Sequence, residues 1–306
     1  MSSDTQSRTR PEVWVVAAWA VVLAEFVLAI YLGLKRPGVG PVKAFLYGPP
    51  VIAVVALALG VCGVVWSALR RPFATTQRLV AWCLLGFVIL SATYPLPFPS
   101  ARSSRPSAVR VRFPLEGEWT TAWGGEGEMS QMLRTRPDRC FGFAFVLARD
   151  GITRAESGDP RTAFALHAPV VAPASGTVVR VVDDLPDEDA PREHDLGNHV
   201  VLEVAPQEFL FVCGLEQGSC AVRVGESIAA GAPLARVGAS GRSLLLPEAH
   251  LALHMQDTPD PLWGQGIPFY FFESSIDGAR IARAVPTGRG YFPGRAITGQ
   301  RIAHTP

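Results

Sequence analysis

The chain has 306 residues, of which 48% are hydrophobic and 18% are charged, and its formal net charge is +1. This composition excludes an intrinsically disordered chain, the near-zero charge gives no sign of nucleic-acid binding, and five cysteines are too few for a disulfide-dense scaffold. The charge is unevenly divided, because residues 1–100 contain eight Lys or Arg and three Asp or Glu, whereas the remainder contains 20 and 24. We therefore expect two parts of different physical character.

Three apolar segments follow one another in the first part of the chain. Residues 13–34 contain one charge, Glu25, whereas residues 51–69 and 79–94 contain none. A helix rising about 1.5 Å per residue needs roughly 20 residues to cross about 30 Å of hydrocarbon, so the third segment is short. We predict a membrane region over residues 1–95 with three helices, and two helices as the alternative. A cleaved signal peptide fits the first segment poorly, because the segment is too long and no small-residue cleavage site follows it.

The charges that flank these helices indicate an orientation only weakly. With the N-terminus in the cytoplasm, five arginines lie on the inner side and three basic residues in the outer loop. Three spans then place the C-terminal part outside the cytoplasm. Glu25 lies near the middle of the first span, where a carboxylate is costly and is a candidate functional residue. We favour the alternative of a protonated Glu25 bonded to a neighbouring helix, because no basic intramembrane partner is visible.

The second part of the chain has the residue pattern that is typical of a β protein. Residues 96–108 are rich in Pro, Ser and Arg and are predicted to be an extended linker. From residue 109 onward, short runs rich in Val, Phe and Leu alternate with Gly, Pro and Asp, and no long helical period appears. We predict an all-β domain over residues 109–306, built on an antiparallel sheet. The expected strands are residues 141–148, 167–171, 176–182, 199–204, 209–212, 232–237 and 250–255.

Two segments, residues 172–182 and 222–238, show the turn and strand pattern of β-sandwich hybrid folds. Their turns are expected to place three glycines at positive φ: Gly176, Gly225 and Gly231. Biotinyl and lipoyl carrier domains share this pattern, but they need a lysine to carry the cofactor. Residues 44–306 contain no lysine, so the sequence excludes that activity.

Five short motifs occur in order over roughly residues 113–292. They are Asp150-Gly, Ala172-Pro-Ala-Ser-Gly-Thr-Val-Val, Leu196-Gly-Asn-His-Val-Val-Leu, Val224-Gly-Glu-Ser-Ile with the Gly-Ala-Ser-Gly that follows it, and Ala249-His-Leu-Ala-Leu-His-Met-Gln-Asp. No single motif is specific, but the five in this order resemble the lysostaphin/LytM-type zinc endopeptidase family, which cleaves peptidoglycan cross-bridges. The resemblance implies a zinc ion held by two His and one Asp, with two further His at the catalytic site.

The catalytic positions of that family are largely replaced in this chain. Ala144 stands in the place of the metal-binding Asp, Gly214 in the place of a catalytic His, and Ala252 in the place of a ligand His. No His precedes residue 167 to supply the other ligand, and only His250, at the general acid/base position, is retained. Without its ligands the zinc is expected to be lost, and no cofactor is expected. The cleft itself is expected to persist, lined by Phe141, Phe143, Ala144, His199, Gly214, His250 and Ala252.

Other residues offer metal or thiol chemistry only weakly. Cys140 could bind zinc as a thiolate, although a lone cysteine in an apolar strand more often packs in a core. His199, His250 and His254 could rebuild a metal site, but strand positions four apart are separated by about 13 Å. Cys213 and Cys220 could form a disulfide outside the cytoplasm.

Two further features have simpler explanations than catalysis. Ser240 lies in a Gly-Ala-Ser-Gly turn that resembles half of a nucleophile elbow, but the strand–turn–helix context is missing. The acidic run over residues 183–189 could hold a hard cation weakly, although a solvated loop is the better interpretation.

We therefore predict a multi-pass membrane protein with a degenerate LytM-like domain that lacks peptidase activity and lies in the periplasm. We expect it to act as a cell-envelope binding or regulatory module. The expected partners are a peptidoglycan peptide, an envelope protein such as a wall hydrolase or division factor, and membrane lipid, but no nucleic acid. Two alternatives stay open. One is an active metallo-endopeptidase with a rearranged site that depends on His250, and the other is a structural extracytoplasmic domain that serves a membrane segment with a functional Glu25.

Overall fold

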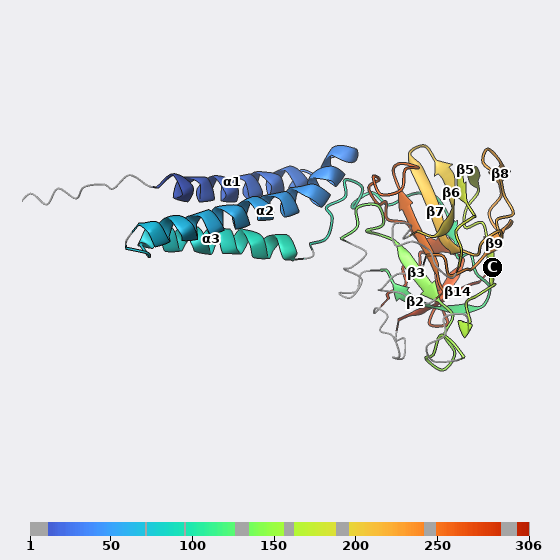
Figure 1. Ribbon diagram of the computed structural model, residues 1–306. Coiled ribbons are helices and arrows are strands. Elements are labelled where there is room, and N and C mark those ends of the chain that lie inside the picture. The colour runs from blue at the N-terminus through green and yellow to red at the C-terminus, as the bar shows by residue number, and fades with distance from the viewer. Residues whose placement is uncertain are drawn as a thin grey trace, which may run out of the picture. The chain divides into compact units, whose positions relative to one another are not determined.

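The computed structural model describes residues 12–70, 72–94, 96–125, 135–155, 162–187, 196–241, 249–288 and 299–305. The chain divides into two compact units, which are Met1–Arg36 with Gly40–Pro95, and Pro37–Val39 with Leu96–Pro306 (Figure 1). The first unit is helical and the second is built from strands.

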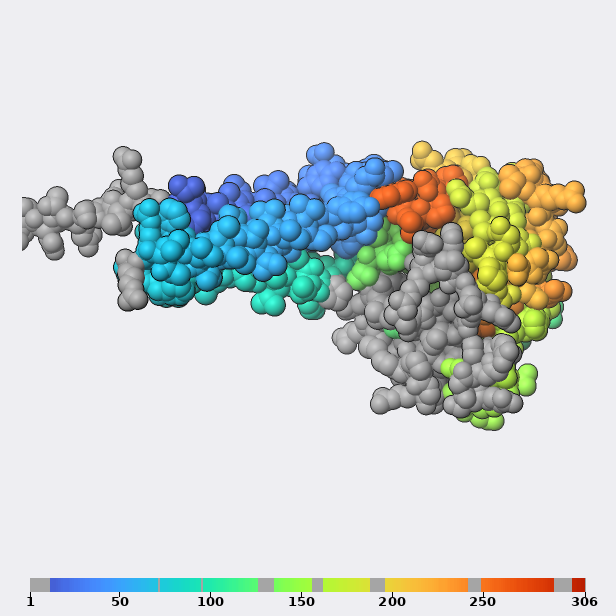
Figure 2. Space-filling view, in the orientation of Figure 1, coloured from blue at the N-terminus to red at the C-terminus, as the bar shows by residue number. Residues whose placement is uncertain are grey.

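The first unit consists of α1 (Val13–Gly33), α2 (Val39–Leu69) and α3 (Thr76–Thr93). All three helices are long and apolar enough to cross a membrane, as predicted. Their large apolar side chains are mostly exposed on the outer surface, which is how helices in contact with lipid differ from those of a water-soluble bundle. In the space-filling view the three helices pack into one continuous body (Figure 2).

The helix boundaries differ from the prediction mainly in α2, which begins at Val39 rather than at residue 51. Pro49 and Pro50 lie inside this helix, although each lacks the N–H that the helical pattern uses. Neighbouring helices and local adjustments of the backbone let membrane helices tolerate such prolines. Helix α3 begins at Thr76 rather than at residue 79, because the Thr75 hydroxyl caps it by accepting a hydrogen bond from the backbone N–H of Arg78.

Helices α1 and α3 are joined by two polar contacts. Arg78 donates to the carboxylate of Glu12 and to three backbone carbonyls of the α2–α3 connection. Further along, the hydroxyl of Ser91 donates to the carboxylate of Glu25. Both contacts join residues that are 66 positions apart. This is expected of two parallel helices, because each advances by the same length per residue. Glu25 therefore has a hydrogen-bonding partner on a neighbouring helix, as the favoured alternative expected, and its protonation stays a prediction.

The second unit confirms the predicted antiparallel all-β domain. Within the described residues, ten strands form one sheet in the order β13-β12-β14-β2-β3-β10-β7-β6-β5-β8, and all neighbouring pairs are antiparallel. The strands are β2 (Glu118–Trp123), β3 (Phe143–Val146), β5 (Gly176–Val182), β6 (Asn198–Ala205), β7 (Glu208–Leu215), β8 (Ser227–Ile228), β10 (Leu251–Gln256), β12 (Ser274–Ile276), β13 (Ala279–Ile281) and β14 (Arg301–His304).

Two smaller pairs of strands complete the described β structure. Strand β1 (Val111–Arg112) runs parallel to β11 (Phe271–Phe272), and β4 (Pro169–Val171) runs antiparallel to β9 (Pro233–Arg236). The main hydrophobic core lies on one face of the central strands. On β10, for example, Leu251 and Leu253 belong to this core, whereas Ala252 packs with the cluster on the opposite face.

Residues 96–108, predicted to be an extended linker, form hydrogen bonds with the β domain. The Ser100 hydroxyl donates to the carbonyl of Gly266 at 2.7 Å, and Arg102 and Ser107 both donate to the carboxylate of Glu208. The polar side chains of this segment thus have partners in the β domain, among them Glu208 of β7.

One glycine also differs from its expected role. Gly225 and Gly231 have positive φ as predicted, but Gly176 does not. A Cβ at Gly176 would lie 2.5 Å from the carbonyl oxygen of Glu203, so this position requires glycine because two backbones approach closely.

Candidate functional site

Four residues from the predicted site region form one row across the sheet. The strand register aligns His199 of β6 with Cys213 of β7, Cys213 with Ala252 of β10, and Ala252 with Ala144 of β3. Directly opposed residues on neighbouring strands point to the same face, so these side chains share the face opposite the main core. We call His199, Cys213, Ala252 and Ala144 the site row, and Figure 1 shows three of the strands that carry it, β3, β7 and β6.

The site row does not fit the zinc ion that the sequence resemblance implies. Ala144 and Ala252 present only methyl groups, and a catalytic zinc needs three protein ligands. Among the residues that the structure describes, no three His, Cys, Asp or Glu side chains come close enough together to hold a metal ion. The described side chains in and around the row therefore include no group of three donors that fits a metal ion.

Gly214 lies in a bulge beside the site row, at a position that cannot carry a side chain. The pairing of β6 with β7 shifts here, and Gly214 has φ +80°, as in bulges that require glycine. A Cβ at this position would lie 2.3 Å from the carbonyl oxygen of His250. Gly214 therefore presents no side chain to the row, and Cys213 is the residue of this segment that shares the face of the row. The assignment of Gly214 to the place of a catalytic His stays a prediction.

Phe143 was also expected to line the cleft, and the structure places it elsewhere. It precedes Ala144 on β3 and therefore points to the opposite face, into the main core. Its ring centroid lies 5.4 Å from that of Phe269 and 5.2 Å from that of Phe271. Phe141 precedes the strand and is half-buried.

Three buried histidines lie in the site row or near it in the sequence. His199, His250 and His254 are 6%, 8% and 3% exposed. The ring of His254 stacks on Phe211 with centroids 4.5 Å apart and planes at 18°, and the centroid of His199 is 6.3 Å from that of Phe211. The rings of His254 and His199 thus both contact the ring of Phe211, and these contacts contribute to packing on the face of the site row.

Sequence reasoning missed Asp138, a carboxylate whose side chain is only 1% exposed. Arg139 Nε lies 2.9 Å from Asp138 Oδ2, and Arg136 Nε lies 3.7 Å from Oδ1. Burial alone would raise the pKa of this carboxyl, but the positive charges of Arg139, His254 and Arg136 outweigh burial and hold the pKa below its ordinary value. The signal in the sequence was a single Asp close to two arginines in the run that leads into β3.

Cys213 and Cys220 are not joined by the disulfide that was considered from the sequence. Cys213 packs with Val201 and Phe211 on the row side, whereas Cys220 packs against the main core. Burial, followed by the charge and hydrogen bond of Asp183, raises the pKa of the Cys220 thiol to about 12. This thiol is therefore protonated and weakly nucleophilic at neutral pH.

Ser240 has a structural role as a turn residue. Its hydroxyl donates to the carbonyl of Leu215 at 2.8 Å and accepts from the backbone N–H of Asn198 at 2.9 Å, and the residue is fully buried. In the acidic run, the carboxylate of Asp187 accepts from the backbone N–H groups of Gln217 and Ala239. Residues 188 and 189 lie outside the described part of the chain.

No family model matches the chain, and a search of curated proteins finds no relative. Among solved structures, the chain is similar to the catalytic domain of a prophage-encoded M23 protein from Enterococcus faecalis, with 17% identity, coverage of 53% of this chain and 95% of that one, and a TM-score of 0.34.

The β domain resembles M23/LytM-type peptidase domains. A putative M23 peptidase from Pseudomonas aeruginosa is 19% identical, with coverage of 49% of this chain and 46% of that one and a TM-score of 0.29. Lysostaphin from Staphylococcus simulans is 14% identical, with 52% of each chain covered and a TM-score of 0.31. The chain thus spans about half the length of these two proteins. At these identities the likeness concerns the fold and assigns no activity to this chain.

Proposed function

We propose that this protein is a membrane-anchored, degenerate LytM-like protein whose β domain binds its target without cleaving it. The observation that carries the proposal is the site row. In the sequence resemblance Ala144 and Ala252 stand in the places of metal ligands, and the structure pairs them side by side. A Cβ at Gly214 would lie 2.3 Å from the carbonyl oxygen of His250, which supports the absence of a functional side chain there. The strands that carry the site row are nevertheless paired in register. This favours a role in which the surface of the sheet binds a ligand and no metal ion takes part.

The three apolar helices anchor this domain to the cell membrane in our proposal. The end of the helical unit that holds the Glu12–Arg78 ion pair faces the cytoplasm. This orientation follows the small excess of arginine at that end and places the β domain outside the cytoplasm. A fusion of alkaline phosphatase after residue 306 tests it, because this enzyme is active only outside the cytoplasm. An inactive fusion would reverse the orientation.

The ligand that we propose for the β domain is a peptidoglycan peptide, with an envelope protein as the second possibility. The test is sedimentation of the full chain in detergent with insoluble peptidoglycan. Ala252 is half-buried in the site row, so Ala252→Phe is expected to lower the sedimented fraction at least fivefold. Ala303→Phe, at a half-buried position of β14 outside the row, is the matched control and is expected to sediment like the wild type.

Peptidoglycan hydrolysis separates this proposal from the alternative of an active enzyme. Wild-type protein is expected to release no soluble fragments from labelled peptidoglycan. Release that is abolished both by a chelator and by His250→Ala would show a rearranged catalytic site and would overturn the non-catalytic role. The structural alternative is less favoured, because the hydrogen bond from Ser91 already accounts for Glu25 within the helical unit.

A further inference from the structure

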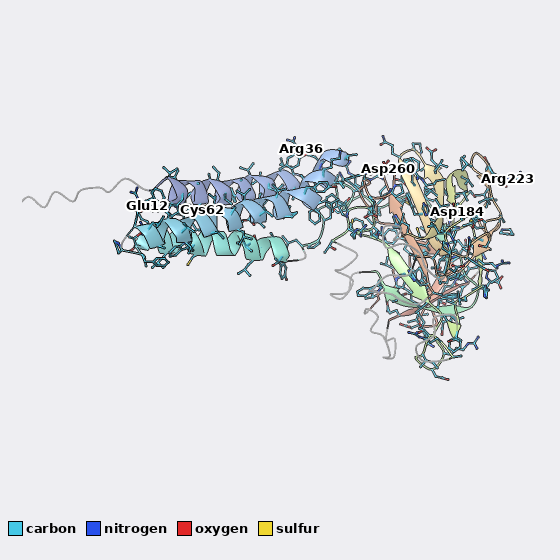
Figure 3. All side chains as sticks on the ribbon, viewed as in Figure 1. Glu12, Arg36, Cys62, Asp184, Arg223 and Asp260 are labelled. Carbon is cyan, nitrogen blue, oxygen red and sulfur yellow. The ribbon has the colours of Figure 1, made fainter. Side chains whose placement is uncertain are left out.

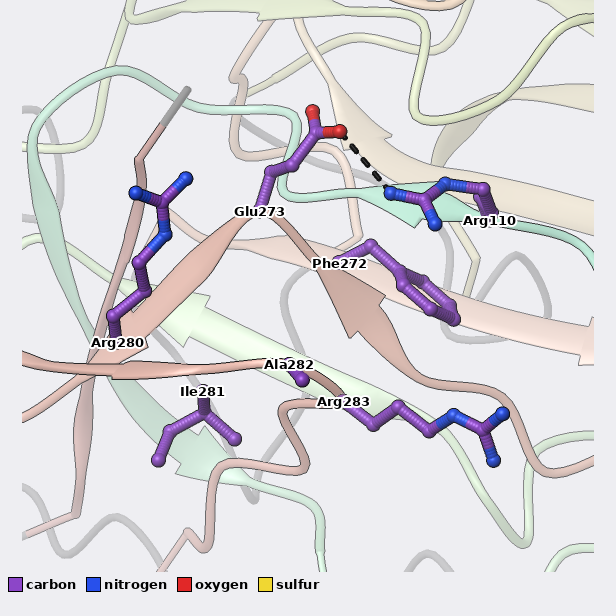
Figure 4. A pocket seen from close by; sticks show the side chains of 7 residues that line it. All are labelled: Arg110, Phe272, Glu273, Arg280, Ile281, Ala282 and Arg283. Atoms are coloured by element: carbon purple, nitrogen blue, oxygen red, sulfur yellow. Dashed lines mark hydrogen bonds and ion pairs between the residues drawn. The ribbon is translucent and has the colours of Figure 1, made fainter.

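A second candidate site lies at the sheet edge, on the hairpin formed by β12 and β13. A pocket of about 510 Å³ opens there between three arginines, one carboxylate and apolar side chains (Figure 4). Strands β12, β14 and β2 separate β13 from β3, where the site row ends, so the pocket is distinct from that row. Its principal lining residues are Arg110, Arg280, Arg283, Glu273, Phe272 and Ile281.

The pocket exists because the hairpin opens between two points of pairing. Ser274 is paired with Ile281, and Phe271 forms an isolated bridge with Ala284. Residues 272–273 on one side and residues 282–283 on the other lie between these two points and are not paired with each other. Among them, Glu273 has φ +50°. Positive φ is uncommon for a residue other than glycine and marks a local constraint on the backbone. The opening is therefore part of the fold of the hairpin.

The charge of the pocket favours an anionic ligand. Arg110 and Glu273 form an ion pair at 3.2 Å, but their side chains are 66% and 51% exposed, so solvent screens the pair strongly. Three arginines against one glutamate leave the lining with a net charge of +2. The guanidinium of Arg110 lies 4.6 Å from the ring centroid of Phe272, and that of Arg283 lies 5.7 Å from the ring centroid of Tyr270. A guanidinium stacked on a ring keeps its in-plane N–H donors directed toward a ligand.

Strand β13 supplies a second feature that points to a peptide. It is the terminal strand of the sheet among the described residues and pairs with β12 on one side. Every residue from 277 to 283 is exposed. The outer edge of such a strand can pair with the backbone of an extended chain, and neighbouring pockets then select alternate side chains.

We propose that the pocket and the outer edge of β13 bind an acidic segment of a partner protein in an extended conformation. The backbone of the segment pairs with β13, its carboxylates bind Arg280 and Arg283, and an apolar side chain packs over Phe272 and Ile281. Alternate residues of an extended strand share one face, so a segment with an acidic residue at every second position presents its carboxylates together to the arginines of the pocket. This proposal does not depend on the role of the site row.

The test is fluorescence anisotropy of a labelled peptide of alternating Glu and Val with the full chain in detergent micelles. We expect the double variant Arg280→Ala/Arg283→Ala to weaken binding at least tenfold. We expect Arg223→Ala to leave binding unchanged, because Arg223 is an exposed arginine at a separate place on the domain (Figure 3). Both exchanged arginines are exposed, and an unchanged melting temperature of the double variant shows that the fold is intact.

A second peptide, with Pro in place of every Val, has the same charge but cannot pair as a strand. We expect it to bind at least tenfold more weakly than the Glu–Val peptide. Equal binding of the two peptides would overturn strand pairing, and undiminished binding by the double arginine variant would overturn the pocket. Full displacement of the Glu–Val peptide by millimolar inorganic phosphate or glycerol phosphate would overturn the peptide ligand in favour of a small phosphate or a lipid headgroup.

Discussion

The backbone of Gly214 lies so close to His250 that a Cβ at position 214 would be 2.3 Å from the His250 carbonyl oxygen. The sequence resemblance predicts that these two positions correspond to catalytic residues, of which His250 alone keeps a histidine. The backbone at position 214 is held against the backbone of His250, so a larger side chain at position 214 requires the backbone to shift.

The substitution Gly214→His tests this relationship. We expect it to destabilise the β domain by about 3 kcal/mol or more, because it combines strain at positive φ with a clash against backbone. Thermal unfolding of the full chain in detergent measures the effect. Gly218→Ala is the matched control, because Gly218 also has positive φ but has open space around it, and we expect it to cost about 1 kcal/mol. A Gly214→His protein as stable as the wild type would contradict the described bulge.

Asp138→Ala is expected to destabilise the protein by about 3–5 kcal/mol at pH 7, because it leaves the partly buried charge of Arg139 without its partner. The folded-state pKa of Asp138 lies below its unfolded value of about 3.9. Its contribution to stability is therefore present above pH 4 and is lost as the pH falls through the folded-state pKa.

Thermal unfolding of the wild type and the variant at pH 7 and pH 3 tests the pH dependence. The difference between the two proteins should shrink at the lower pH. Asp260→Asn, which changes an exposed carboxylate, should have little effect at either pH (Figure 3). A difference that stays the same at pH 3 would show that the charge of Asp138 is not what stabilises the fold.

The thiols of Cys213 and Cys220 should both be found free. We expect mass spectrometry after alkylation in denaturant without reductant to show both residues labelled. In the native protein, alkylation of Cys220 should be slow at pH 8, because a thiol with a pKa of about 12 is almost wholly protonated there. A mass lower by two hydrogens, with both cysteines unlabelled until reductant is added, would show the disulfide instead.

The contact between Glu25 and Ser91 predicts different effects for two substitutions. Glu25→Gln retains a hydrogen-bonding partner for Ser91 and should leave the stability of the helical unit unchanged. Glu25→Ala removes the partner and should cost about 1 kcal/mol, a typical value for a hydrogen bond between membrane helices. Thermal unfolding in detergent measures both. Glu25→Gln protein that folds normally but fails in the cell would make Glu25 a functional residue.

The central strands of the β domain could be predicted from the sequence, because their apolar runs are long and bounded by turn residues. Residues 176–182, for example, were predicted as a strand and form β5 with those bounds. Strands β12 and β13 were missed because each has three residues, most of them polar or exposed, and exists through pairing with distant strands. The start of α2 was missed because Pro49 and Pro50 oppose helix locally while the apolar surroundings favour it.

The candidate site was also predictable from the sequence only in part. The alanines at positions 144 and 252 were assigned to ligand positions from motif spacing, because a motif specifies the order and separation of its residues. The constraint at Gly214 could not be predicted in this way, since it arises from a strand about 36 residues further along the chain. The position of Asp138 beside His254 likewise depends on the fold and not on local sequence.

The zinc content of the protein tests the central claim most directly. The full chain should be purified in detergent, equilibrated with excess zinc, separated from free metal by gel filtration and analysed by mass spectrometry of the metal. We expect far less than one zinc ion per chain, with no change on His250→Ala, because the site row lacks the ligands that a catalytic zinc requires. One tightly bound ion per chain that is lost on His250→Ala would contradict the account and identify the domain as a metal-dependent hydrolase.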